Sequence, residues 1–120
     1  MLNTPGGLLD STRDIVGSLS NSPVPVVVYV GPTGAHAASA GTFVTAAAHV
    51  AAMAPITNIG AASPMALGED LPETLERKAT QDAAVLLREI AENRGRNSEA
   101  LQRTVFEATA YSATEALENN

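Results

Sequence analysis

One apolar run limits the folds available to this chain. After the break at Asn21-Ser22-Pro23 comes the segment Val24-Pro25-Val26-Val27-Val28-Tyr29-Val30, which is rich in β-branched residues and does not alternate between polar and apolar positions. Such a run is typical of a strand buried on both faces, as in a parallel sheet covered by helices. We therefore expect an α/β fold with a largely parallel sheet.

Helical and extended patterns surround this strand. Apolar residues recur at a spacing near 3.6 from residue 8 to about residue 20, which predicts an amphipathic helix. After a turn at 31–34, the Ala-rich segment from residue 35 to about residue 50 predicts a buried helix. Residues 51–54 and 56–62 predict two short extended segments.

The second part of the chain predicts helices. Residues 63–71 are rich in Pro, Gly and acidic side chains and predict a surface loop. Pro72 and Gly95 mark the start and end of a helix, Asn97 is a candidate N-cap of the next, and Ser112 begins a capping-box pattern. At 120 residues we expect one domain, with regions at 1–62, 63–71 and 72–120.

Composition excludes several classes of function. A chain with 45% hydrophobic and 17% charged residues has enough apolar surface for a folded core. The net charge of −6, with only seven Lys and Arg, argues against nucleic-acid binding. The absence of cysteine excludes disulfides and thiolate chemistry. The longest apolar stretch, 43–56, is shorter than the roughly 18 residues of a membrane helix, and the first residues lack the pattern of a signal peptide.

Ser39 lies among small residues in the segment Gly34-Ala-His-Ala-Ala-Ser39-Ala-Gly41-Thr42. Small neighbours leave room for a substrate backbone. A helix that begins beside the serine would also supply free N–H groups and a partial positive charge for an oxyanion. The pattern fits a nucleophile, and it fits a plain helix N-cap equally well.

The chain offers few partners for a serine nucleophile. His49 would lie about 15 Å from Ser39 along a continuous helix, and His36 would lie in the turn with no carboxylate to orient it. Of the seven Lys and Arg residues in the chain, six are arginines, and Lys78 is the only lysine. Lysine can act as a base once burial favours its neutral form, whereas arginine cannot. A solvated helix lysine explains position 78 as well, and we expect both histidines to be structural or exposed.

Two further groups complete the candidates. Paired glycines at Gly6 and Gly7, before the first helix, can present N–H groups to an anion, although a tight turn explains them equally. The acidic residues at 69, 70, 73 and 76 have no His or Cys nearby, so we expect a solvated face, no metal site and no cofactor.

Three segments together resemble the NfeD-type membrane-bound serine proteases of the ClpP class. They are residues 2–16, residues 34–42 with 53–55 and 59–62, and Lys78-Ala-Thr-Gln-Asp-Ala83 with Arg94-Gly-Arg-Asn97. The resemblance implies a ClpP/crotonase-like domain of stacked ββα units. It also implies Ser39 as nucleophile, Lys78 as base, and an oxyanion hole formed by Gly6 or Gly7 with the N–H of Ala40.

The same resemblance implies a setting and partners. We expect a membrane-associated, extracytoplasmic protease that cleaves apolar segments of proteins such as stomatin-like membrane proteins. We also expect a homodimer or larger homo-oligomer, and a chain truncated at both ends relative to the family. Two rival hypotheses are a crotonase-type acyl-CoA enzyme and a non-catalytic assembly module of the same fold.

Overall fold

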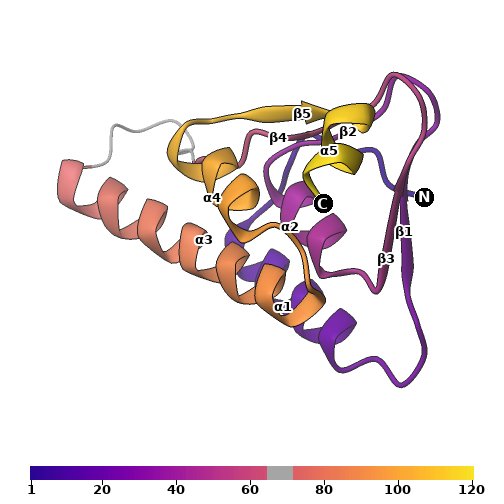
Figure 1. Ribbon diagram of the computed structural model, residues 1–120. Helices are drawn as coiled ribbons and strands as arrows, with labels where there is room; N and C mark the ends of the chain where they lie inside the picture. Colours follow the sequence, from indigo (N-terminus) through magenta and orange to yellow (C-terminus); the bar gives the residue numbers. More distant parts are fainter. Residues whose placement is uncertain (65–71) are drawn as a thin grey trace.

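Short strands and helices alternate in the first 60 residues, and helices dominate the rest. The computed structural model describes residues 1–64 and 72–120. Figure 1 shows the elements in chain order: α1 (Leu9–Ser20), β1 (Val27–Val30), β2 (His36–Ala37), α2 (Ala40–Ala47), β3 (Val50–Met53), β4 (Asn58–Gly60), α3 (Glu73–Arg94), α4 (Ser98–Phe106), β5 (Ala110–Ser112) and α5 (Ala113–Asn119).

The strands form two small sheets. In the first, β1 pairs in parallel with β3, so that Val27 lies opposite Val50 and Val30 opposite Met53. In the second, β4 lies between β2, which is parallel to it, and β5, which is antiparallel. The predicted α/β fold with a largely parallel sheet is confirmed. Strand β5 was not predicted, because its pairing joins segments about 50 residues apart.

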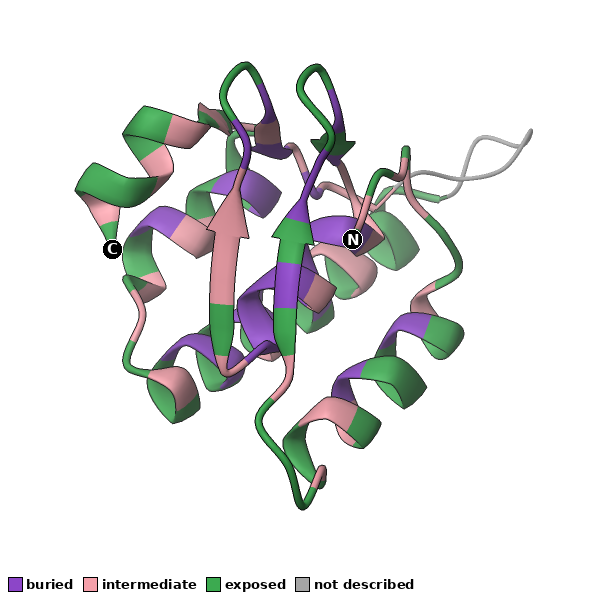
Figure 2. Cartoon of the chain, turned by 90° about the vertical axis from the view of Figure 1, so that its right-hand side faces the viewer, coloured by how far each residue is buried: buried purple, intermediate pink, exposed green. Residues whose placement is uncertain are grey.

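The first sheet has one uncovered face. Val28 and Val30 are buried, whereas Val27 is 59% and Tyr29 40% exposed. Figure 2 shows this face of β1 and β3 turned toward the viewer, with the helices behind the sheet. The prediction that this strand is buried on both faces is therefore wrong. In residues 1–64 and 72–120, helices cover the sheet from one side only.

The Ala-rich segment 35–50 is not one helix. Its residues form β2, a bend at Ser39, the eight-residue helix α2 and the first residue of β3. The backbone of Ser39 has φ 49° and ψ −115°, which ends the strand and starts the helix. Alanine fits both structures, so the composition concealed the boundary that the tertiary pairing of β2 with β4 imposes.

The main core lies between the helices and joins the two ends of the chain. Val16 of α1, Phe43 of α2, Leu87 of α3 and Val105 of α4 are buried together with several alanines. A second cluster under the sheets contains Val30, Ala35, Ala37 and Ile59. Alanine at these contacts lets helix backbones approach closely, which places α2 centrally between α1 and α3 (Figure 1).

The predicted helix ends of the second part are confirmed. Gly95 follows α3 in the left-handed conformation, with φ 67°. The Asn97 side chain accepts a hydrogen bond from the Ala100 N–H at 2.9 Å, and Ser112 and Glu115 form a full capping box. The predicted loop at 63–71, with Glu69 and Asp70, falls largely outside the described residues. Among the described helices none is long and apolar enough to cross a bilayer.

Candidate functional site

Ser39 lies at the N-terminus of α2 with its hydroxyl free. It occupies the N-cap position, yet its side chain makes no capping hydrogen bond, and within the described residues its hydroxyl has no partner. The Ser39 N–H donates to the Ala61 carbonyl at 2.9 Å, and the Ser39 carbonyl accepts from the Thr42 N–H at 2.9 Å. The backbone is thus fixed while the hydroxyl remains available.

The conformation of Ser39 is strained and locally supported. A positive φ is uncommon for a residue other than glycine, and such residues cluster at active sites. The buried Thr42 hydroxyl donates to the Ala37 carbonyl at 3.2 Å and accepts from the Gly60 N–H at 3.1 Å. Thr42 therefore ties the start of α2 to β2 and β4. No local pattern singles out Thr42, because its role depends on a contact with a residue 18 positions away.

Ser39 opens into a cleft of about 520 Å³. The structure brings together Gly6, Gly7, Ser39 and Ala40, as expected for an oxyanion site. The full lining is Pro5, Gly6, Gly7, Leu8, Leu9, Thr12, Ser39, Ala40, Phe43, Ala62, Pro64 and Ala83. Most of these side chains are small or apolar.

The two glycines have different roles. Gly6 has φ 145°, and a Cβ there would lie 3.0 Å from the Ser39 Cβ and 3.4 Å from its Oγ. Its N–H donates to the Thr4 Oγ1 at 3.2 Å, and that hydroxyl donates to the Gly6 carbonyl at 3.1 Å. The N–H groups of Gly7 and Ala40 have no partner within the described residues. Of the three expected oxyanion donors, Gly7 and Ala40 therefore remain free, and Gly6 provides space.

Lys78 lies apart from this cluster. It is exposed on α3 and is not among the residues that line the cleft. The helix reaches the cleft at Ala83, five residues later, which is about 7.5 Å along the helix axis. The structure thus assembles four of the five predicted site residues and leaves the lysine outside.

Neither histidine lines the cleft. His49 lies beyond the end of α2, where its Nδ1 accepts a hydrogen bond from the Val26 N–H at 2.9 Å. His36 lies in β2 rather than in a turn; its side chain is exposed, and its N–H donates to the Asn3 Oδ1 at 3.1 Å. In the described part of the chain, no group of three or more His, Cys, Asp or Glu could hold a metal ion.

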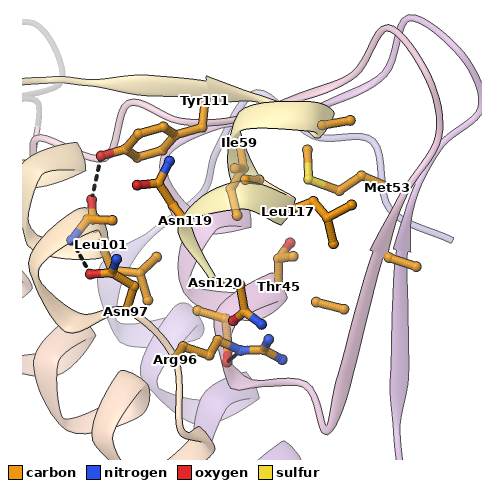
Figure 3. A pocket seen from close by; sticks show the side chains of 16 residues that line it. Thr45, Met53, Ile59, Arg96, Asn97, Leu101, Tyr111, Leu117, Asn119 and Asn120 are labelled. Carbon is orange, nitrogen blue, oxygen red and sulfur yellow. Dashed lines mark hydrogen bonds between the residues drawn. The ribbon is translucent and has the colours of Figure 1, made fainter.

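A second cavity of about 380 Å³ lies on the other side of α2 (Figure 3). The Tyr111 hydroxyl donates to the Ala100 carbonyl at 3.1 Å near its rim. Its lining is Thr45, Ala46, Ala51, Ala52, Met53, Ile59, Arg96, Asn97, Ala100, Leu101, Tyr111, Ala113, Ala116, Leu117, Asn119 and Asn120. Among its lining residues there is no nucleophile next to two free N–H groups that could bind an oxyanion. The cleft at Ser39 is therefore the candidate active site.

Known proteins match almost the whole chain. The model of the NfeD1b N-terminal domain family matches residues 1–117. The membrane-bound protease PH1510 of Pyrococcus horikoshii is 36% identical over 118 residues, which cover 97% of this chain and 27% of that protein. The chain therefore spans about a quarter of the length of this curated relative.

Solved structures of a 1510-N membrane-bound stomatin-specific protease match the fold. A mutant with a lysine replaced by alanine, in complex with a substrate peptide, has a TM-score of 0.88 and 34% identity, and the match covers 98% of this chain and 55% of that one. A mutant with a serine replaced by alanine has a TM-score of 0.89 and 33% identity, with 98% and 58% covered. The chain thus has the fold of this protease, and it belongs to the NfeD1b N-terminal domain family.

Proposed function

We propose that this chain carries the catalytic serine of a peptidase that hydrolyses peptide bonds in apolar segments of membrane-associated proteins, such as stomatin-like proteins. The observation that carries the proposal is the free Ser39 hydroxyl beside the free N–H groups of Gly7 and Ala40. The related 1510-N protease is specific for a stomatin homologue and has been solved with a substrate peptide. The small and apolar cleft lining agrees with such a substrate.

The proposed reaction is acyl transfer. The Ser39 Oγ attacks the carbonyl carbon of the scissile peptide, and its proton passes to the neutral amine of Lys78. The N–H groups of Gly7 and Ala40 stabilise the oxyanion, aided by the positive end of α2. Collapse of this intermediate breaks the C–N bond, and the protonated lysine donates a proton to the leaving amine. Water then hydrolyses the Ser39 ester through the same base.

The assignment of Lys78 as base rests on chemistry and relatives. Lys78 is the only lysine of the chain, and the solved relatives include one mutant of a serine and one of a lysine. A lysine base must be neutral, and burial favours the neutral amine. Lys78 is exposed here, so in this proposal the bound peptide or a neighbouring subunit covers it during the reaction.

We further propose a ClpP/crotonase-like ancestry, a membrane-associated and extracytoplasmic location, and assembly as a homodimer or larger homo-oligomer. The support is the sequence resemblance and the membrane-bound relative. A shared interface is a direct way to cover Lys78, because α3 extends past the cleft with its first turns exposed.

The test combines labelling and turnover. The intact protein and its Ser39→Ala variant are treated with a fluorophosphonate probe, and the modified residue is mapped by mass spectrometry. The same proteins are assayed on a peptide copied from the apolar segment of a stomatin homologue. We expect labelling at Ser39 and cleavage, both lost in Ser39→Ala.

Two outcomes would reject the peptidase. One is undiminished cleavage by Ser39→Ala. The other is a protein that neither reacts with the probe nor cleaves the peptide. In the second case, hydrolysis of an acyl-CoA thioester would favour the crotonase-type enzyme, and no turnover of either substrate would favour the assembly module.

A further inference from the structure

Two arginines that contact no substrate cleft hold the far end of the Ser39 helix. Arg94 and Arg96 lie on either side of Gly95, where α3 ends. The Arg96 Nε donates to the Ala46 carbonyl at 2.9 Å, and its Nη2 donates to the Ala48 carbonyl at 2.8 Å. The Arg94 Nε donates to the Ala47 carbonyl at 2.9 Å. Together they satisfy three consecutive carbonyls at the end of α2.

These carbonyls need partners from elsewhere in the chain. The last carbonyls of a helix have no intrahelical donor, and Ala46, Ala47 and Ala48 are at most 2% exposed, which leaves little access for water. The last turn of α2 contains no basic residue, and its C-cap, Ala48, is extended rather than left-handed. Within the helix end itself only the Thr45 carbonyl is satisfied, by the Ala48 N–H at 3.3 Å, and the two guanidinium groups cap the next three carbonyls.

The two positively charged guanidinium groups lie close together at the negative end of the α2 helix. In residues 1–64 and 72–120 neither guanidinium pairs with a carboxylate. Burial and the neighbouring charge of Arg94 lower the pKa of Arg96 from its ordinary value, although arginine stays charged near neutral pH. The negative end of the α2 dipole compensates this close approach of two cations. Figure 3 shows the Arg96 side chain beside α2, at the wall of the second cavity.

The side chains of α2 leave a role for these bonds in fixing its position. Most of its side chains are small, and Phe43 is the only large one buried in the main core. Small side chains interlock weakly, so they oppose sliding and rotation of the helix less than large ones do. A helix of eight residues is about 12 Å long, and its backbone hydrogen bonds connect one end to the other. A shift at Ala46 therefore moves Ser39 and the Ala40 N–H at the other end.

We propose that Arg94 and Arg96 are positioning residues for the Ser39 site. They fix the position of α2 along its axis and its rotation about that axis. In this way they also fix the positions of the Ser39 hydroxyl and the Ala40 N–H relative to Gly7. This role rests on the proposed function of Ser39 as nucleophile. Arg94 also donates to the Leu19 carbonyl at 3.4 Å, which ties α1 to the same anchor.

The experiment compares arginines that donate to the end of α2 with one that does not. Arg96→Met and Arg94→Met remove the donors to α2, and Arg96→Lys keeps a cation that can donate to one carbonyl. Arg88→Met is the control, because Arg88 lies on α3 close to Arg94, is exposed, and in the described chain its only ion pair is with the Glu89 carboxylate at 3.8 Å. Intact proteins are assayed for peptide cleavage at a temperature at which thermal melts show each variant folded.

We expect Arg96→Met to lower kcat about 10-fold with KM within about twofold of the parent, because displacement of a reacting group by a fraction of an ångström already slows the chemical step. Arg94→Met should act in the same direction, Arg96→Lys should recover part of the loss, and Arg88→Met should match the parent. Equal kcat in folded Arg96→Met and Arg88→Met would overturn the proposal. A loss confined to KM, or one that Arg96→Lys does not reduce, would do the same.

A second measurement does not need activity. Amide hydrogen exchange is followed at both ends of α2 in the same variants. We expect faster exchange at 46–49 and also at 40–43 in Arg96→Met, with α4 unchanged. Exchange that rises only at 46–49 would show that the two ends are uncoupled and would overturn the proposal. If Arg96→Met does not fold, Arg96→Lys and Arg88→Lys provide the same two comparisons. If the parent cleaves no peptide, the proposed function fails, and the exchange result alone decides the positioning role.

Discussion

The helix that begins at Ser39 and the helix that carries Lys78 are held in different ways. The start of α2 is fixed by backbone bonds from Ser39 and by the two bonds of the buried Thr42 hydroxyl, and its end is fixed by two arginines. Lys78 lies in an exposed part of α3, beside Arg77 and its ion pair with Glu73. The proposed nucleophile is therefore held in place by its own chain, whereas Lys78, the proposed base, is exposed in the described structure.

The largest expected effect is the loss of kcat/KM on substitution of Lys78, which tests whether this lysine is a catalytic base or only a solvated side chain. Lys78→Ala and Lys78→Arg should each lower kcat/KM by about 100-fold to 10,000-fold, because arginine keeps the charge but cannot accept a proton. The free energy of unfolding should change by less than about 0.5 kcal/mol, since the side chain is exposed. Steady-state kinetics and urea denaturation measure the two quantities.

Arg77→Ala is the control for Lys78, because it removes a neighbouring exposed cation whose only ion pair in the described chain is with Glu73. It should leave kcat/KM unchanged. Full activity in Lys78→Arg would mean that position 78 supplies at most charge, and the contrast between a prepared nucleophile and an unprepared base would disappear.

The next effect tests the space that Gly6 leaves for the serine. Gly6→Ala should lower kcat at least about 10-fold, because the new methyl group would lie 3.0 Å from the Ser39 Cβ and displace the nucleophile. Gly34→Ala is a matched control: Gly34 also has a positive φ, 89°, but nothing lies within 4 Å of a Cβ there. Both variants should lose about 1–3 kcal/mol of stability, because alanine rarely adopts a positive φ.

Kinetics and thermal denaturation of the two glycine variants separate contact from strain. Only Gly6→Ala should lose activity when both are assayed below their melting temperatures. Equal kcat in the two variants would show that the short contact with Ser39 has no catalytic consequence.

A smaller effect concerns the anchor of the nucleophile. Thr42→Val should lower the free energy of unfolding by about 1–3 kcal/mol, because it leaves the buried Gly60 N–H without an acceptor. Thr45→Val should lose less than about 1 kcal/mol, since the Thr45 hydroxyl only donates to the Gly41 carbonyl four residues earlier. Urea denaturation gives both values. A larger loss in Thr45→Val would refute the assignment of Thr42 as the buried link between α2 and β4.

Local chemistry explains which parts of the fold could be predicted from the sequence. The ends of α3, α4 and α5 were predicted from Gly95, Asn97 and the Ser112 capping box, because a cap depends on residues within one turn of each other. The parallel pairing of β1 followed from its β-branched composition. The exposed face at Val27 and Tyr29 did not, because a uniformly apolar run carries no information about which face a neighbouring layer covers.

Contacts between distant residues explain what was missed. The bend at Ser39 is held by Ala61 and Thr42, and β5 forms only against β4, so neither boundary is visible in a local pattern. The clustering of Gly6, Gly7 and Ala40 around Ser39 was expected from the family resemblance. The sequence pattern alone was equally compatible with a plain turn at the glycines and a plain helix N-cap at the serine. The role of Lys78 stays a prediction, because its side chain is exposed and outside the lining of the cleft.

The smallest expected effect is a change in stability at two glycines that differ in backbone conformation and not in side-chain contact. Gly17 lies inside α1 and Gly95 at the end of α3, and nothing lies within 4 Å of a Cβ at either position. Gly17→Ala should stabilise the protein by about 0.5–1 kcal/mol, because alanine loses less backbone entropy in a helix. Gly95→Ala should destabilise it by about 1 kcal/mol, since φ is 67°. Thermal denaturation should give shifts of opposite sign with kcat unchanged in both, and shifts of the same sign would contradict this account. Neither residue contacts Ser39. A change of kcat in either variant would therefore show that catalysis also requires glycine at positions other than Gly6, in or beside the helices around the cleft.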